Sequence, residues 1–89
     1  MSLTPEQKEK IEQIVKDVFE EIESAHAKHG PLPDDFSDCM LVIGEEFGEA
    51  CKAAWEFKWM LTDSLLSNIR KELIQVAAMS IATIYYGGL

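Results

Sequence analysis

The stretch 73–86 constrains the fold most, because it is apolar on nearly every side of the helix that it predicts. Gln75 and Ser80 interrupt its apolar run, which falls short of the roughly 20 residues that a membrane span needs. A helix that is apolar all round must be covered all round, and two other helices in a chain of 89 residues cannot cover it. We therefore expect no membrane association and a homo-oligomer with this helix near its centre.

The first predicted helix has clear start and stop signals. Thr4 is placed as its N-cap, Pro5 takes the first helical position, and Gln7 completes a capping box. The helix is expected to end near His29, because residues 30–33 contain one glycine and two prolines.

Two more helices follow. The second is expected to begin between residues 36 and 39, after an Asp-rich loop. The third is expected to take Thr62 or Asp63 as its cap and to run to about residue 86, before two glycines. No linker is long enough to divide the chain, so we expect a single all-α domain over residues 1–89, in which three helices assemble into a bundle.

Apolar side chains recur at helical spacing on the first two helices and predict one apolar stripe along each. On the first helix they are Ile11, Ile14, Val15, Val18, Phe19, Ile22 and Ala25. On the second they are Met40, Ile43, Phe47, Ala50, Cys51 and Ala54. Gly44 and Gly48, four residues apart, are expected to permit close helix packing or access to a site.

The charge balance limits the classes of partner. Sixteen acidic and 8 basic residues give a net charge of -8, which argues against general nucleic-acid binding. The N-terminus lacks the basic and apolar regions of an export signal, so we expect a cytoplasmic protein. Cys39 and Cys51 are 12 positions apart, about 18 Å on one helix, which is too far for a disulfide. Both are expected to pack in the core.

Acidic residues at helical spacing predict a metal site. Glu45, Glu46 and Glu49 fall within an arc of roughly 100° on one helix face. Glu72 and Gln75 are also three positions apart, so two antiparallel helices would present four oxygen ligands across one gap. This pattern favours Mg²⁺, with Mn²⁺ as the alternative. For the first three residues taken alone, the alternative interpretation is an acidic helix face in contact with solvent.

The same residues resemble a known family. Glu46-x-x-Glu49, 22 intervening residues and Glu72-x-x-Gln75 are similar to the E-x-x-E, spacer, E-x-x-D signature of the all-α nucleoside triphosphate pyrophosphohydrolases, the MazG-like group. The local strings 44–50 and 70–78 resemble short, phage-type members, and the resemblance covers residues 23–84 approximately. It departs at Gln75, which offers an oxygen without the charge of the usual Asp.

The resemblance implies a helical bundle that works as a homodimer or homotetramer and is a hydrolase dependent on Mg²⁺. Its substrate would be a nucleoside triphosphate, cleaved to the monophosphate and pyrophosphate. Glu46, Glu49 and Glu72 would hold the metal, with Gln75 as a neutral fourth ligand. Glu45 would lie beside these ligands or orient the attacking water as a base.

Further residues are candidates for substrate contact, each with a simpler alternative. Lys52 is a candidate for phosphate contact, although we favour an ion pair with Glu49, one turn away. Trp59, like Trp55, would stack a base, although we favour a core or subunit contact for both. Lys58 and Arg70 would contact phosphate or else lie in solvent. The alternative function is a catalytically weak or inactive helical oligomer that binds nucleotide or a protein partner.

Overall fold

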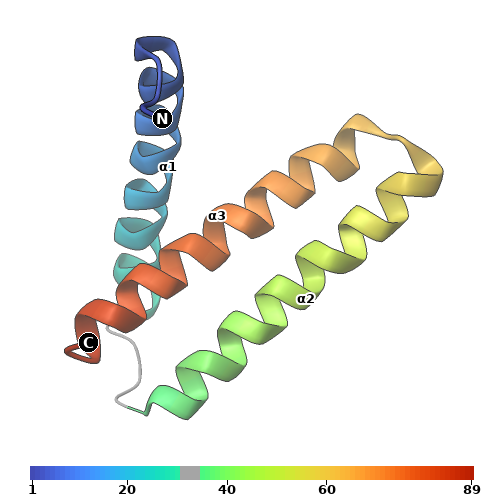
Figure 1. The fold of residues 1–89 in the computed structure, drawn as a ribbon. Helices are drawn as coiled ribbons and strands as arrows, with labels where there is room; N and C mark the ends of the chain where they lie inside the picture. The colour runs from blue at the N-terminus through green and yellow to red at the C-terminus, as the bar shows by residue number, and fades with distance from the viewer. Residues whose placement is uncertain (31–34) are drawn as a thin grey trace.

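The computed structural model describes residues 1–30 and 35–89, and the described chain forms three helices and no strand. Helix α1 spans Pro5–His29, α2 spans Phe36–Met60 and α3 spans Asp63–Tyr86 (Figure 1). The all-α fold and the predicted bounds of the helices are therefore confirmed. The prolines that we expected to stop the first helix lie outside the described residues. Within the part of the chain that is described, none of the helices has the length and apolarity needed to cross a membrane.

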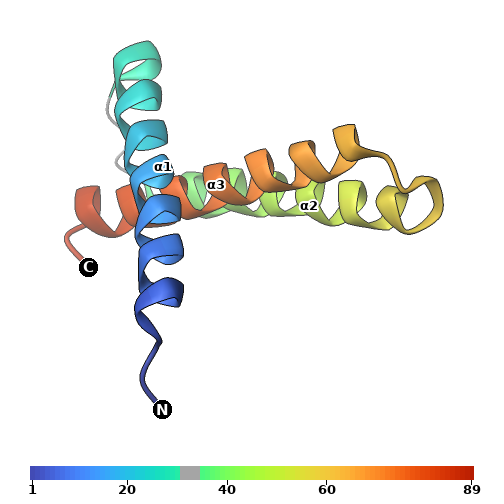
Figure 2. The same cartoon turned by 90° about the horizontal axis from the view of Figure 1, so that it is seen from above.

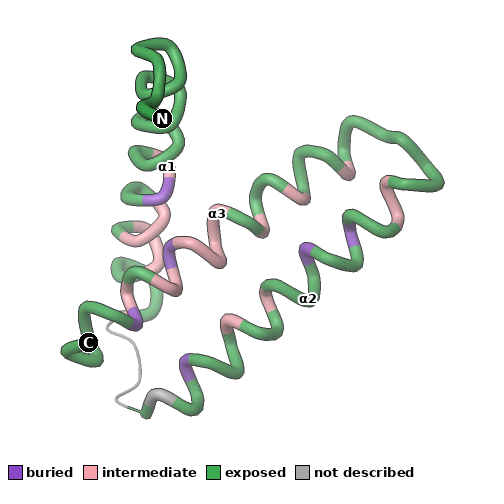
Figure 3. The backbone as a smooth tube through the Cα atoms, viewed as in Figure 1, coloured by how far each residue is buried: buried purple, intermediate pink, exposed green. Residues whose placement is uncertain are grey.

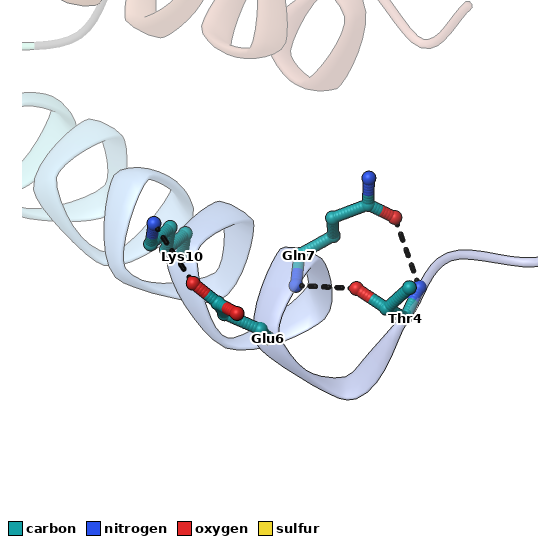
Figure 4. Close-up of polar contacts among 4 residues, drawn as sticks. All are labelled: Thr4, Glu6, Gln7 and Lys10. Atoms are coloured by element: carbon teal, nitrogen blue, oxygen red, sulfur yellow. Dashed lines mark hydrogen bonds and ion pairs between the residues drawn. The ribbon is translucent and has the colours of Figure 1, made fainter.

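Each helix begins with the cap that its local sequence favours. The Gln7 backbone N–H donates to Thr4 Oγ1 at 3.1 Å and Gln7 Oε1 accepts from the Thr4 N–H at 2.9 Å, which completes the predicted capping box (Figure 4). Asp35 Oδ1 accepts from the Ser37 N–H at 2.7 Å at the start of α2. Thr62, rather than Asp63, caps α3. These bonds satisfy backbone donors that a helix start would otherwise leave unpaired.

Helix α3 is the element against which the other two helices pack. Helices α2 and α3 form an antiparallel hairpin, whereas α1 crosses α3 at a steep angle on its other side (Figures 1 and 2). No packing joins α1 to α2 in the described residues. Polar contacts also join α1 to α3. Arg70 and Asp17 form an ion pair at 2.5 Å, and Tyr86 Oη forms a hydrogen bond with His26 Nδ1 at 3.1 Å.

The core within one chain is small. Its buried apolar residues are Val18, Cys39, Ala50, Ala53 and Ala78, and no large side chain is fully buried in the described residues (Figure 3). Most members of the two predicted apolar stripes are therefore not buried within one chain. Of the first stripe only Val18 is buried, and of the second only Ala50. The reason is that each of these helices meets one neighbour along a narrow line, so a broad stripe cannot be covered inside the chain.

Two smaller expectations about α2 are corrected in part. Cys39 is buried as predicted, but Cys51 is exposed, because it lies on the side of α2 that faces away from α3. A Cβ atom added at Gly44 or Gly48 would meet nothing within 4 Å, so the described part of the chain shows no close packing at these glycines.

Candidate metal centre

The antiparallel hairpin brings together the acidic residues that the sequence analysis singled out. Glu46 and Glu49 are one turn apart on α2 and Glu72 lies opposite on α3, so their side chains converge from two helices. One carboxylate oxygen from each of Glu46, Glu49 and Glu72 lies within 4.8 Å of the other two. Such a set of oxygens suits a hard divalent cation, and metal binding by these residues stays a prediction.

Gln75 lies beside two of the three carboxylates, those of Glu46 and Glu72. With its amide nitrogen turned toward them, Gln75 donates to Glu72 Oε2 at 3.2 Å and to Glu46 Oε2 at 3.0 Å. A glutamine amide can also turn its oxygen to the same point, where it would serve as a neutral ligand. Gln75 is therefore placed either to bridge two carboxylates as a donor or to join them around a cation.

Crowding of negative charge has a clear effect on Glu46. Burial raises the pKa of Glu46 to about 7 from an ordinary value of 4.5. A side-chain hydrogen bond with Glu72 and the charges of Glu72, Glu49 and Glu45 act in the same direction. The fold therefore holds these carboxyl groups closer together than their charges favour.

No basic side chain of the described residues forms an ion pair with this cluster. The two ion pairs among the described residues are Lys10 with Glu6 and Arg70 with Asp17, and neither involves the acidic cluster. Lys52, which we expected to pair with Glu49, forms no ion pair in the described structure, and this expectation is corrected. Lys52 is exposed and lies one turn of α2 beyond Glu49.

An apolar groove leads to the cluster. Because α1 and α2 both pack on α3 but not on each other, they leave a hollow of about 780 Å³ lined by all three helices. Glu46 and Gln75 lie on its wall, while Phe19, Val42 and Met79 contribute apolar surface. The sequence analysis missed this groove, because the apolar stripes alone do not reveal which two helices stay apart.

Lys58 lies among aromatic rings. Its Nζ atom is 5.4 Å from the ring centroid of Trp55 and 5.4 Å from that of Trp59. The two rings meet edge to face with centroids 5.8 Å apart, and 60% and 67% of these residues is exposed. A core role for the tryptophans is therefore wrong within the chain, because the last turns of α2 present them to solvent. The Lys58 ammonium gains a cation–π contact in place of simple solvation.

Two other predicted site residues differ in where the structure places them. Arg70 pairs with Asp17, so its guanidinium fastens α1 to α3, a contact that the sequence spacing did not reveal. Glu45 is exposed and lies near enough to Glu46 for its charge to raise the pKa of that residue. Glu45 is thus an exposed carboxylate beside the cluster.

Comparison with known proteins adds no relative: no protein-family model, curated protein or solved structure matches the chain. The resemblance to the MazG-like group therefore stays a prediction drawn from the acidic motif and its spacing.

Proposed function

We propose that this protein is a Mg²⁺-dependent nucleoside triphosphate pyrophosphohydrolase of the MazG-like type, acting as a homodimer or homotetramer. The observation that carries the proposal is the convergence of Glu46, Glu49 and Glu72, whose oxygens lie within 4.8 Å of one another. Three carboxylates that form no ion pair with any described residue favour a bound cation. A cation is also what a polyanionic substrate needs to approach a chain of charge -8.

The cation would be held by the three carboxylates, with Gln75 as a neutral fourth ligand, and would offset phosphate charge and polarise the attacked phosphorus centre. The residues of the chain then have separate tasks. Glu45 accepts the proton of the attacking water, and the α–β phosphoanhydride bond breaks as pyrophosphate or monophosphate leaves with its electron pair. Lys52 stabilises negative charge on the phosphates from the next turn of α2.

A product assay tests this function directly. The purified protein would be given Mg²⁺ and a panel of ribo- and deoxyribonucleoside triphosphates, and the products would be separated by anion-exchange chromatography. We expect equal amounts of nucleoside monophosphate and pyrophosphate. Release of orthophosphate with a nucleoside diphosphate would assign a different hydrolase activity, and the same assay without Mg²⁺ is the control.

A second function is favoured by the observation at Gln75. An amide that donates to both Glu46 and Glu72 binds the carboxylates together without a metal, as in a helical oligomer that binds nucleotide or a protein partner with little or no catalysis. In the product assay this alternative predicts no turnover with any triphosphate.

Substitution of Gln75 distinguishes the two. If Gln75 is a neutral ligand, Gln75→Asp adds a ligand charge and we expect Mg²⁺ to bind about tenfold more tightly, with faster turnover. Gln75→Leu should weaken Mg²⁺ binding. Isothermal titration with Mg²⁺ measures both, and Gln13→Leu on the exposed side of α1 is the control for a lost amide. A less stable Gln75→Asp protein with unchanged Mg²⁺ affinity would show that Gln75 is a structural donor.

A further inference from the structure

Helix α1 carries an apolar surface that none of the described residues covers. Its first half extends past α2 and α3, and every residue there is exposed (Figures 1 and 3). Val15 is 57% exposed and Phe19 is 60% exposed, although both belong to the regular apolar stripe of this helix. The capping box and the ion pair between Lys10 and Glu6 support the helix at this end. A well-capped helix with a bare apolar stripe points to a docking surface.

The total exposed area indicates how large the missing contact is. The chain exposes 6945 Å², whereas a compact folded monomer of 10.0 kDa exposes about 5,200 Å². The excess of roughly 1,700 Å² lies within the range that one subunit buries in a permanent dimer, about 1,000–2,500 Å². A small ligand in the groove would cover only part of this excess, so a second protein surface fits it better.

If the second protein surface is α1 of another copy of this chain, the charges of α1 favour one orientation of the two helices. Residues 5–16 contain three acidic and three basic side chains, whereas residues 17–29 contain four acidic side chains and one lysine. Two parallel copies of α1 would bring the two acidic halves together. Two antiparallel copies bring each acidic half against the balanced half of the other, which lowers the repulsion.

The spacing of the exposed apolar residues fits the same arrangement. Ile11, Val15 and Phe19 form an i, i+4 row that is symmetric about Val15. In a two-fold symmetric pair the same patch serves both subunits, so a row with its own centre of symmetry can pack on itself.

We propose that α1 pairs antiparallel with α1 of a second copy of this chain, around a two-fold axis near Val15. Ile11 then faces Phe19 of the partner subunit, and Val15 lies against Val15 of the partner subunit. The pairing specifies one interface of the proposed homo-oligomer and is independent of the metal centre. Since Phe19 also lines the groove beside Glu46 and Gln75, the partner helix lies at the edge of that groove.

Sedimentation and light scattering of the Val15→Glu protein test the proposed α1 interface. Val15→Glu places a charge at the centre of the pair, so we expect the dimer dissociation constant to rise at least about 100-fold. Gln13→Glu adds the same charge on the side of α1 away from the stripe and should leave assembly unchanged. Because Val15 is exposed in the single chain, helical content measured by circular dichroism should be retained. A Val15→Glu protein that assembles like the wild type overturns the proposal.

Cysteine trapping tests the orientation, in a Cys51→Ser background that removes the exposed native thiol. Val15→Cys should form a disulfide-linked dimer on oxidation, because the two positions meet at the axis. Ile11→Cys alone should not, since its two copies are about 12 Å apart along the helices, but a refolded mixture with Phe19→Cys should. Cross-linking of each of the three variants with itself would indicate parallel helices and overturn the proposal.

A monomeric wild-type protein at all concentrations would overturn both this pairing and the homo-oligomer. The pyrophosphohydrolase proposal would still be decided separately by the product assay. A dimer that responds to neither Val15→Glu nor the cysteine variants would overturn the α1 pairing alone.

Discussion

Glu49→Gln is expected to lower nucleoside triphosphate hydrolysis by about 100-fold or more, with little change in the fold. Glu49 is exposed, so the isosteric amide leaves the packing of α2 intact while it removes one charged oxygen from the cluster. Mg²⁺ at a hundredfold excess over its dissociation constant should stabilise the wild-type protein by about 2.7 kcal/mol, a rise in Tm on the order of 10 °C. In Glu49→Gln this gain should be largely lost.

The control is Glu56→Gln, which makes the same charge change on the same helix, seven positions further along and outside the cluster. It should keep both turnover and the rise in Tm with Mg²⁺. Steady-state kinetics and thermal melting, each with Mg²⁺ and with EDTA, measure the two effects. Equal losses of turnover and of the Tm rise in both variants would contradict the metal centre. So would a wild-type Tm that does not change with millimolar Mg²⁺, with and without nucleotide.

Without divalent metal, the protein should become less stable as the pH rises from about 4.5 to about 7. Glu46 has its pKa raised to about 7 in the folded chain, against an ordinary value of 4.5. The folded state therefore holds a proton that the unfolded state has lost across this window. Its stabilising contribution is complete below pH 4.5 and is lost as the pH passes 7, for a decrease of about 1–3 kcal/mol in the free energy of unfolding.

Urea unfolding in EDTA at pH 5 and pH 8, at one protein concentration, measures this decrease. Glu46→Gln stays neutral at both values and should lose most of it, whereas Glu20→Gln, an exposed position on α1, should match the wild type. An identical pH dependence in wild type and Glu46→Gln would contradict the assignment to Glu46. Saturating Mg²⁺ should weaken the dependence, because a cation favours the charged carboxylate.

The convergence of the carboxylates at the candidate metal centre could be predicted from two local spacings, together with the assumption that the second and third helices are antiparallel. Glu46 with Glu49, and Glu72 with Gln75, are each one turn apart, so each pair shares a helix face whatever the fold. That the faces meet depends on the antiparallel hairpin, which the short connection between α2 and α3 favours. The raised pKa of Glu46 could not be predicted from the sequence, because it depends on how much water remains around the carboxyl group in the folded chain.

The residues that departed from expectation share a physical cause. Lys58 lies over Trp55 and Trp59, and Arg70 pairs with Asp17, a residue 53 positions away in the chain. Long side chains find their partners only after helices are placed, because several partners are within range of a flexible stem. Spacing along one helix cannot choose among them.

The sequence by itself determined where the helices begin and end and which carboxylates share a face. Caps, prolines and i, i+3 spacing act within a few residues, so the helix bounds and the shared faces do not depend on how the helices pack. Only the tertiary structure decided which side of each helix is covered. Both α1 and α2 pack on α3, and they leave a groove between them. Most of the apolar stripe around Val15 is exposed. The reason is that burial depends on which apolar faces compete for one small surface, and that competition involves the whole chain.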